Sequence, residues 1–490
     1  MTADGGIAPA GHAPAEVPHA STPHIPTPNT SASDTSAPDT SAPNPSPPLV
    51  SQPGAPQPTP ARRAEGGTEL RSREAAEAYI ASVCFKHGPP RYVGVELEWL
   101  LRSAPDRPGG PAADLPALVR ALGPHAPTGL DPSSPALPLP SGSLVTVEPG
   151  GQVELASPPI ADLGELVAAV ESDTAVLHSR LAAAGLFPEP RAADPVRPAH
   201  RVLRLPRYSA MERCLDRVGP HGRSGMCSTS AVQVALDAGE RAGIADRWAG
   251  LHELGPVLVA AFANSPVMHG RATGWKSTRL ATWLALDPVR TAPPTSLAGD
   301  PAQAWAERVV GTPLLCIRGE GEWRTPEHVT FADWAEGGLP GPPPTVDDLE
   351  YHVSTLFPPV RPRGFLEVRY VDGQQGADWQ LPVAVLAALS ASPSALDRAR
   401  EICEPTRDRW TSAARHALAD PVLARAAREL FPLASAELAG LPGAPPALVA
   451  RLAEITEGRV AAGRCPADDP LPGEPGVPAA PIPTTEGALP

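Results

Sequence analysis

The sequence has few aromatic residues and few cysteines, and both shortages limit what it can fold into. Phenylalanine, tyrosine and tryptophan make up 4% of the 490 residues, so the core must be built largely from Ala, Val and Leu. The six cysteines are scattered and form no Cys-x-x-Cys pair. This spacing argues against a zinc or disulfide framework and fits a reducing cytoplasm.

Several kinds of segment are also missing. The N-terminus has no basic start followed by an apolar core, which argues against a signal peptide, and no apolar run approaches the about 20 residues of a membrane span. Neither Gly-x-x-x-x-Gly-Lys-Ser/Thr nor Gly-x-Gly-x-x-Gly occurs, so a P-loop or Rossmann site is not supported. A formal net charge of −14 argues against a nucleic-acid surface. We therefore expect a cytoplasmic protein that binds neither membrane nor nucleic acid.

Proline and glycine, by contrast, are abundant, with 67 Pro and 43 Gly, and proline is enriched toward the two ends. Residues 1–67 are Pro, Ser, Thr and Ala with almost no large apolar residue, so burial cannot offset their ordering entropy. We predict a disordered tail over residues 1–67 and a second, Pro-rich one over residues 463–490. Between them we predict a single domain, residues 68–462, that is rich in helix from about residue 381.

The most informative stretch is residues 92–99, where apolar residues alternate with Gly94, Glu96 and Glu98. Strict alternation predicts a strand, and a strand points Glu96 and Glu98 to the same face. Neighbouring carboxylates repel each other, and on a half-buried sheet they need a cationic partner such as Mg²⁺ or Mn²⁺, which prefer hard oxygen ligands. The alternative is an antiparallel sheet whose polar face is simply solvated.

Residues 144–159 predict a hairpin, because two short apolar runs flank a Pro-Gly-Gly turn. Glu148 and Glu154 lie on its two arms. A loop with an odd number of residues would put both carboxylates on one face, whereas a two-residue Gly-Gly turn would put them on opposite faces. The sequence leaves this open, and it also permits an ordinary hairpin with surface glutamates.

Two further predicted strands carry polar residues. In residues 228–237, Gln233 is flanked on its face by small residues, which leaves room beside its amide. In residues 365–372, Glu367 and Arg369 share one face. Gln233 could be a solvent-facing residue and the Glu–Arg pair a salt-bridge ladder. They could equally supply a metal or ligand contact and a cation for developing negative charge.

Residues 270–290 are dense in polar and aromatic side chains. Lys276, Ser277, Arg279 and Arg290 are packed around Gly and Trp, a composition that can hold phosphate and an adenine ring. A plain basic surface cluster is the alternative.

The remaining periodicity is mostly helical. We expect helices over residues 69–86, 115–122, 161–184, 206–215, 251–263, 345–357, 381–389, 396–404, 409–438 (interrupted at Pro421 and Pro432) and 447–455. One more strand is expected over residues 313–318.

Acids at strand spacing recur on three separate strands, which independent salt-bridge ladders would not require. A carboxylate-lined sheet that holds two or more divalent metals for phosphoryl transfer explains the recurrence more economically. As a set and in this order, the motifs resemble the glutamate–cysteine ligases, most of all the actinobacterial branch that feeds ergothioneine biosynthesis. The resemblance is carried by residues 94–98, 148–154, 229–237, 276–290 and 366–369, spans about residues 70–440, and leaves out both tails.

The resemblance implies an α+β fold similar to the catalytic domain of glutamine synthetase: a curved antiparallel sheet, flanked by helices, whose concave face holds metals, ATP and glutamate. It implies ATP-dependent ligation of L-glutamate to L-cysteine through γ-glutamyl phosphate, with Mg²⁺ (or Mn²⁺) as cofactor and ATP as co-substrate. The partners would be small molecules only. The oligomeric state stays open, and a monomer is plausible.

The resemblance also implies roles for individual residues. The expected metal ligands are Glu96, Glu98, Glu154, Glu367 and Gln233, the last at a place where some relatives have histidine. Arg369, with Glu367, would serve the transferred phosphoryl group. The expected substrate or ATP contacts are Glu148, Gln152, Gln233, Lys276, Ser277, Arg279, Arg290 and Arg369.

Two other functions remain compatible with the sequence. One is a ligase of the same fold that joins glutamate to a different amine, because the motifs fix the activating half of the reaction better than the acceptor pocket. The other is a non-catalytic relative that binds glutamate or nucleotide, against which the intact acid set argues.

Overall fold

The computed structural model describes residues 67–103 and 114–471, all of which belong to one compact unit, Ser51–Pro490. The tail predicted over residues 1–67 lies outside the described residues except for Gly67, as does the C-terminal tail from residue 472 onward. Within the described part of the chain no single helix is long and apolar enough to cross a bilayer. One sharply bent pair, Gly376–Ser390 with Pro393–Thr406, reaches that length and composition only when taken together.

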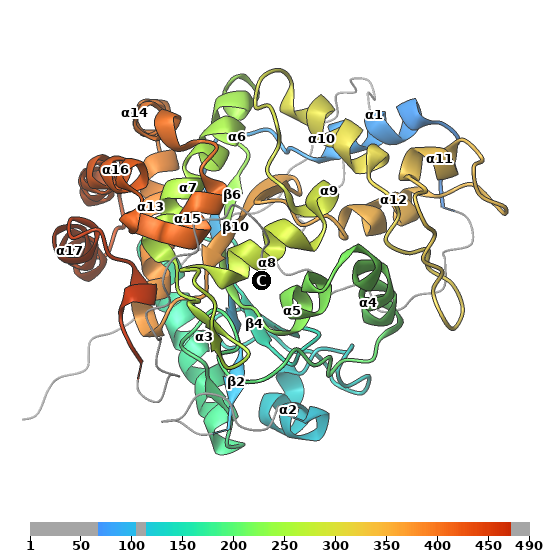
Figure 1. Ribbon diagram of the computed structural model, residues 1–490, viewed down its shortest axis with the longest axis horizontal. Coiled ribbons are helices and arrows are strands. Elements are labelled where there is room, and N and C mark those ends of the chain that lie inside the picture. The colour runs from blue at the N-terminus through green and yellow to red at the C-terminus, as the bar shows by residue number, and fades with distance from the viewer. Residues whose placement is uncertain (1–66, 104–113, 472–490) are drawn as a thin grey trace, which may run out of the picture. The chain divides into compact units, whose positions relative to one another are not determined.

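A six-stranded antiparallel sheet lies at the centre of the described residues (Figure 1). In spatial order its strands are β3 (Leu144–Val147), β4 (Val153–Ala156), β1 (Val93–Trp99), β6 (Ala231–Asp237), β10 (Phe365–Asp372) and β9 (Val360–Pro362). Two small antiparallel pairs accompany it, β2 (Leu101–Arg102) with β5 (Phe187–Pro188) and β7 (Val267–Met268) with β8 (Arg271–Ala272). The predicted α+β class with an antiparallel sheet is therefore confirmed.

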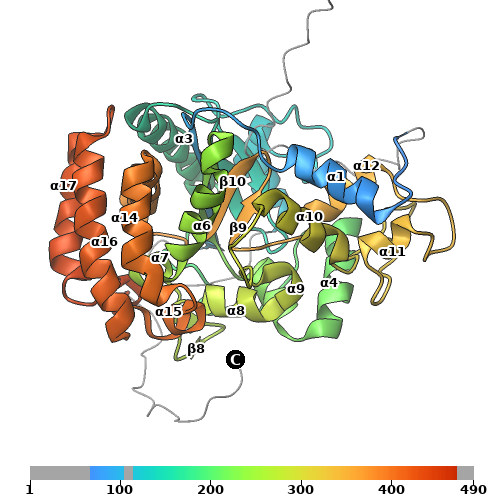
Figure 2. The same ribbon diagram turned by 90° about the horizontal axis from the view of Figure 1, so that it is seen from above.

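Each predicted helical range contains a helix. The helices that precede β9 in the chain are α1 (Arg73–Val83), α2 (Leu115–Leu122), α3 (Leu163–Ala183), α4 (Pro206–Val218), α5 (His221–Cys227), α6 (Ile244–Glu253), α7 (Gly255–Phe262), α8 (Thr278–Leu286), α9 (Pro288–Thr291), α10 (Pro301–Gly311), α11 (Phe331–Ala335) and α12 (Val346–Val353). Of these, α5, α8, α9, α10 and α11 were not predicted from the sequence. The C-terminal ones are α13 (Gln380–Ser390), α14 (Pro393–Cys403), α15 (Trp410–His416), α16 (Pro421–Gly440) and α17 (Pro446–Ile455), of which α14, α16 and α17 lie side by side (Figure 2).

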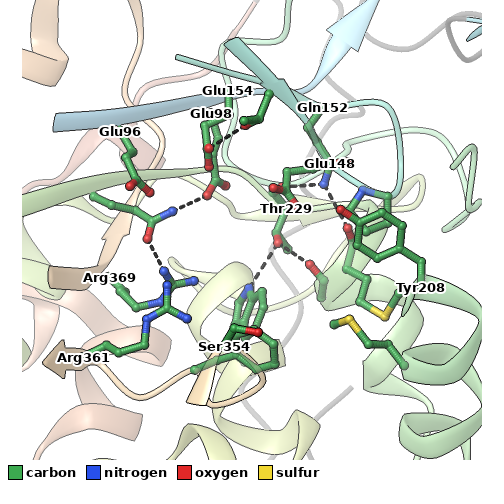
Figure 3. Close-up of a pocket in the computed structure, with 18 of the residues that line it drawn as sticks. Glu96, Glu98, Glu148, Gln152, Glu154, Tyr208, Thr229, Ser354, Arg361 and Arg369 are labelled. Carbon is green, nitrogen blue, oxygen red and sulfur yellow. Dashed lines mark hydrogen bonds between the residues drawn. The ribbon is translucent and has the colours of Figure 1, made fainter. Parts of the chain in front are cut away.

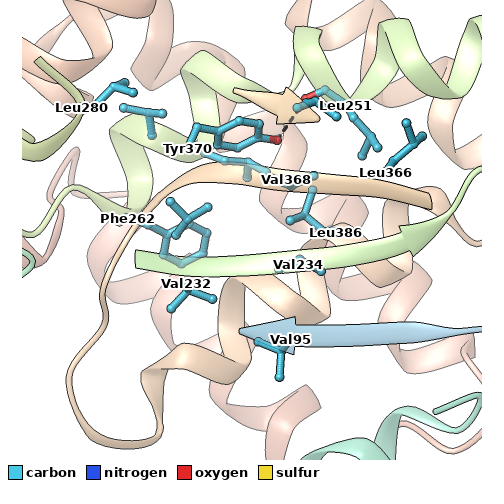
Figure 4. Close-up of a cluster of buried hydrophobic side chains, with 14 of the residues drawn as sticks. Val95, Val232, Val234, Leu251, Phe262, Leu280, Leu366, Val368, Tyr370 and Leu386 are labelled. Carbon is cyan, nitrogen blue, oxygen red and sulfur yellow. Dashed lines mark hydrogen bonds between the residues drawn. The ribbon is translucent and has the colours of Figure 1, made fainter. Parts of the chain in front are cut away.

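One face of the sheet is apolar and forms part of the hydrophobic core. Val95, Val234 and Val368, on three adjacent strands, are each 0% exposed (Figure 4). Helices α3, α7 and α13 pack on these strands. Because aromatic residues are scarce, the core consists mainly of Ala, Val and Leu, as the composition predicts. Burial of this face fixes the strand registers, since a slip by one residue would bring the polar face into the core.

Four expectations about the chain need correction. Residues 251–263 do not form one helix: α6 ends at Glu253 and α7 begins at Gly255, because Pro256 has no N–H to continue the hydrogen-bond ladder. Residues 313–318 make only isolated bridges, from Pro313 to Thr330 and from Ile317 to Arg324. Pro432 does not interrupt α16, which continues through it to Gly440 with Pro432 on its exposed side.

The fourth correction concerns the start of the C-terminal tail, predicted at residue 463. The chain remains packed on the domain as far as the described residues reach. The buried Arg191 guanidinium donates to the carbonyl oxygens of Pro466 (3.0 Å) and Asp469 (2.7 Å), and Lys276 pairs with Asp468 (2.5 Å). These contacts hold residues 466–469 against the domain, although their composition predicted a disordered tail.

The hairpin turn between β3 and β4 approaches the α5–β6 junction closely. A Cβ atom on Gly150 would lie 2.2 Å from the carbonyl oxygen of Cys227, so only glycine fits there. Gln152 fastens the same turn, because its amide donates to the carbonyl oxygens of Met226 (3.2 Å) and Thr229 (3.0 Å). The turn is thus held against the start of β6.

We predict that Gly150→Ala destabilises the protein by about 1–3 kcal/mol, because the added methyl group must displace backbone rather than a flexible side chain. The matched control is Gly243→Ala, an exposed position with φ −103° where an added methyl group would meet no atom within 4 Å. Urea unfolding of both variants measures the difference. Equal stability of the two variants would contradict the close approach.

Candidate active site

The second face of the sheet is polar, and it forms the floor of a solvent-open hollow of about 1070 Å³ (Figure 3). Helices α4, α5 and α8 form its opposite wall. The residues that line it are Glu96, Glu98, Thr146, Glu148, Pro149, Gln152, Glu154, Arg207, Tyr208, Met211, Gly225, Met226, Thr229, Gln233, Trp283, Ser354, Phe357, Arg361, Arg363 and Arg369. A hollow that is apolar in part and has convergent polar groups is typical of a small-molecule site.

Strand register gathers the carboxylates. Glu98 of β1 lies directly opposite Glu154 of β4, and Glu96 lies two residues along the same strand, opposite Gln233 of β6. The loop between β3 and β4 contains an odd number of residues. The Glu148 N–H donates to the Gln152 carbonyl oxygen (2.8 Å), which leaves three residues in the turn. Glu148 and Glu154 therefore share the polar face, and both line the pocket.

Burial and mutual repulsion raise the pKa values of these carboxyl groups. Desolvation, and then the charge of Glu367, raise the pKa of Glu96 to about 7. Desolvation, and then the charge of Glu98, raise the pKa of Glu148 to about 7, although Arg207 opposes this. The pKa values of Glu98 and Glu154 are raised as well, chiefly by burial. Ionising all four carboxyl groups together is thus costly without added positive charge.

A second cluster, of arginines, surrounds Glu367. Arg361 donates to both carboxylate oxygens (2.6 and 3.1 Å), Arg363 donates to one (3.2 Å) and Arg369 to the other (3.0 Å). Burial by itself would raise the pKa of Glu367, but the three guanidinium groups, Arg361 foremost, hold it well below its usual range. Glu367 is therefore a buried anion that fixes three cations at the edge of the pocket.

Gln233 connects the acidic cluster to the arginine cluster. Its amide nitrogen donates to Glu98 Oε1 (2.6 Å), and its amide oxygen accepts from Arg369 Nη1. The residue is 3% exposed, and its flanking positions on β6 are Ala231 and Ala235, as the sequence indicates. Because its oxygen already accepts from Arg369, Gln233 bridges the clusters.

The donor set fits hard divalent cations. Glu96, Glu98, Glu148 and Glu154 offer carboxylate oxygens on one face, and their raised pKa values mark a site where cations would relieve repulsion. Within residues 67–103 and 114–471, no three His, Cys, Asp or Glu side chains already surround a common metal position. Rotation of neighbouring side chains such as Glu98 and Glu154 would be needed to form one. The oxygens of Glu367, by contrast, are engaged by arginines.

Four of the predicted substrate contacts, Lys276, Ser277, Arg279 and Arg290, do not line the pocket. Ser277 accepts from the Leu280 N–H, which caps α8, and donates to Asp372 (2.8 Å). Buried Arg290 donates to Asp287 (2.9 Å). Lys276 pairs with Asp468. These side chains hold together the loops behind the pocket.

Arg279 takes an intermediate position. Its Nη2 donates to the backbone carbonyl oxygen of Arg369 (2.8 Å), and its Nη1 lies 3.8 Å from Asp372 Oδ1. Its charge lowers the pKa of Glu98 against the larger effect of burial. Within the described residues its buried Nε and Nη1 atoms have no hydrogen-bond partner. Arg279 thus supports Arg369 from behind, with unused donors.

Sequence reasoning missed several pocket residues. Arg361 and Arg363 are separated by one residue immediately before the Glu367 strand, a spacing that could have revealed two cations on one face. Arg207 and Tyr208 carry no such signal, because they reach the pocket only through the placement of α4.

Comparison with known proteins gives a consistent result. A family model described as "Glutamate-cysteine ligase family 2(GCS2)" matches residues 92–472. The glutamate–cysteine ligase EgtA of Mycobacterium tuberculosis is 37% identical over 415 residues, which cover 83% of this chain and 91% of that protein. The EgtA protein of Mycolicibacterium smegmatis is 39% identical over 384 residues, which cover 77% and 88%.

Among solved structures, the glutamate–cysteine ligase of Francisella tularensis in complex with AMP aligns with a TM-score of 0.46 at 14% identity, covering 78% of this chain and 84% of that one. The family assignment depends on the sequence matches, which span most of the chain. The chain belongs to glutamate–cysteine ligase family 2.

Proposed function

We propose that the protein is an ATP-dependent glutamate–cysteine ligase. The γ-carboxylate of L-glutamate attacks the γ-phosphorus of ATP, which gives γ-glutamyl phosphate and ADP. The uncharged amine of L-cysteine then attacks the acyl carbon; the new C–N bond forms as the C–O bond to phosphate breaks, and phosphate and a proton leave. The observation that carries the proposal is the meeting of an acidic cluster and an arginine cluster in one pocket.

The acidic cluster supports the first step. We assign Glu96, Glu98 and Glu154, with Glu148 beside them, as the residues that hold Mg²⁺ or Mn²⁺. When bound there, the cations supply charge neutralisation as the two anionic substrates meet. The carboxylates themselves fix where ATP and the γ-carboxylate must lie, so much of the rate enhancement comes from positioning.

The arginine cluster stabilises the negative charge of the phosphoryl group during its transfer. Arg369 and Arg361 present guanidinium groups at the pocket, which suit the equatorial oxygens of a phosphoryl group in transfer. Glu367 orients these cations. Gln233 holds Arg369 in place relative to Glu98, because its amide hydrogen-bonds to both side chains. Such preorganised charge does not need to rearrange during the reaction.

Arg279 supports the site from behind the pocket, where it holds the Arg369 backbone and its charge acts on Glu98. The product would enter ergothioneine or another low-molecular-weight thiol, in line with the resemblance of the motifs, and the enzyme would work in the cytoplasm on small-molecule substrates.

We expect purified protein to release phosphate and form a product with the mass of γ-glutamylcysteine when given ATP, Mg²⁺, glutamate and cysteine. A panel of other amines tests the alternative acceptor. Turnover with another amine but not with cysteine would replace cysteine in the proposal, and ligand binding without phosphate release from any mixture would favour a non-catalytic relative.

We predict that Glu96→Gln and Glu367→Gln each lower the rate of phosphate release at least about 100-fold, the first by removing a metal ligand and the second by releasing three arginines. The matched control is Glu429→Gln, an exposed position on α16, which should keep the wild-type rate. Circular dichroism establishes that each variant is folded. Rates near wild type in both pocket variants would contradict the assignment.

We also predict a pH-dependent effect of the metal. The pKa values of Glu96 and Glu148 are raised from 4.5 to about 7 in the folded, metal-free protein, so these groups lower its stability progressively as pH rises through that interval. Mg²⁺ should therefore raise the melting temperature more at about pH 8 than at about pH 6, where protons compete with it. Scanning calorimetry with Mg²⁺ and with EDTA measures this. A shift that is the same at both pH values would argue against carboxylate ligation.

A further inference from the structure

Strand β10 contains a β-bulge opposite Gln233 of β6. Val368 pairs with Val234, and Val371 pairs with Val232. Between these pairs, positions 369 and 370 of β10 lie opposite position 233 alone, so β10 has one residue more than a regular antiparallel ladder would contain. A bulge of this kind bends the strand and re-aims its side chains.

The bulge changes which side chains of β10 reach the polar face of the sheet. Tyr370 and Val371 follow each other in the chain, yet both lie in the hydrophobic core, where Tyr370 packs beside its neighbours (Figure 4). Regular alternation would have sent Val371 to the polar face. Instead Asp372, which pairs with Ala231, takes that face, as Arg369 does before the bulge. Two charged side chains on either side of the bulge thus share one face.

Asp372 is a buried acceptor for two neighbouring segments. It is 2% exposed and does not line the pocket. Its Oδ2 accepts from the Asn264 N–H (2.9 Å) and the Ser265 hydroxyl (2.7 Å), which follow α7, and its Oδ1 accepts from the Ser277 hydroxyl (2.8 Å) at the start of α8. Burying a carboxylate is costly unless it is hydrogen-bonded or paired, and these donors meet that need. Asp372 therefore ties the end of β10 to the segments around α7 and α8.

Arg279 of α8 extends this network across the bulge. Its Nη2 donates to the Arg369 carbonyl oxygen (2.8 Å), while its Nη1 lies 3.8 Å from Asp372 Oδ1. The Arg369 N–H donates to the carbonyl oxygen of Pro359, the residue before β9 (2.8 Å). Both backbone groups of Arg369 are thus held by residues outside β6. Because the backbone sets the direction of the side chain, this network fixes where the Arg369 guanidinium enters the pocket.

We propose that Asp372 is a positioning residue for phosphoryl transfer, because it holds the bulge in the conformation that aims the Arg369 guanidinium at the pocket. The inference rests on the proposed ligase function, in which Arg369 stabilises the transferred phosphoryl group. It adds to that function the buried residue behind the pocket on which the direction of Arg369 depends. A misplacement of about 1 Å at a reacting centre can lower a rate about 100-fold, so a side chain remote from the substrate can still control turnover.

Two other roles for Asp372 fit less well. A metal ligand must reach the pocket with oxygens that are free to coordinate, whereas Asp372 does not line the pocket and its oxygens accept from three donors. A purely structural acid would change the stability of the fold without acting through Arg369. The second role makes a different kinetic prediction, which a double-mutant cycle measures.

The test is such a cycle between Asp372 and Arg369. Asp372→Asn keeps the size of the side chain and removes its charge. We expect it to lower kcat for phosphate release about 10- to 100-fold, while the KM values of ATP, glutamate and cysteine change less than about threefold. In an Arg369→Ala background no guanidinium is left to aim, so the same substitution should lower kcat less than about twofold further, measured with radiolabelled ATP.

The matched control is Asp173→Asn. Asp173 of α3 is 0% exposed, lies outside the pocket lining, and accepts from the N–H groups of Ser141 (2.7 Å) and Ser143 (3.0 Å). This variant should lower the melting temperature, as Asp372→Asn does, and should leave kcat within about twofold of its parent in both backgrounds. Equal fold losses from Asp372→Asn in the two backgrounds, or a raised KM at unchanged kcat, would overturn the proposal.

A milder variant keeps the proposal testable if Asp372→Asn does not fold. Ser265→Ala removes one hydrogen-bond donor from Asp372. It should lower kcat about 3- to 10-fold when Arg369 is present and should have no further effect in Arg369→Ala. The same loss in both backgrounds would count against the positioning role.

Crystal structures of wild type and Asp372→Asn separate this inference from the proposed function, because they require no turnover. We expect the variant to displace the Arg369 guanidinium from Gln233 and Glu367 by about 1 Å or more. That displacement, with no phosphate release by wild type in any mixture, would support the positioning role and refute the ligase. Normal turnover by both proteins with Arg369 in place would support the ligase and refute the inference.

Discussion

The site depends on the repulsion among four glutamate side chains that the strand register forces onto one face of the sheet. Glu98 is paired with Glu154, Glu96 follows two residues along, and the three-residue turn adds Glu148. The apolar face fixes this register, because Val95 and its neighbours fill the core. The fold therefore keeps a charge arrangement that is unfavourable by itself and that divalent cations would relieve.

In the neighbouring arginine cluster, by contrast, opposite charges are already paired. Glu367 is a buried anion, stabilised by Arg361, Arg363 and Arg369, so its charge is satisfied within the protein. Gln233 joins the two clusters without adding charge, which an amide can do because it donates on one side and accepts on the other. Negative groups that need a cation and positive groups that are already oriented thus lie side by side, an arrangement suited to moving a phosphoryl group between two anions.

The hairpin turn places Glu148, the fourth of these carboxylates, in the pocket. Gly150 allows the turn to touch the Cys227 backbone, and Gln152 fastens it to Met226 and Thr229. These contacts position Glu148 in the pocket that helices α4 and α5 line from the other side. The same backbone approach that packs the hairpin therefore also determines where Glu148 lies relative to the other three carboxylates.

The sequence by itself determined strands β1, β6 and β10, because alternation has a period of two and shows on which face Glu96, Gln233, Glu367 and Arg369 lie. It could not determine the number of residues in the hairpin turn, which places Glu148 on the polar face. It also could not determine the partners of Ser277 and Arg290 or the presence of Arg207 in the pocket lining. Local pattern also misread residues 313–318 and the chain beyond residue 463, whose conformations depend on distant partners such as Thr330 and Arg191. Periodicity reports which way a side chain points within its own element, whereas contacts between elements are decided only by tertiary packing, and the residues that complete the pocket belong to that second kind.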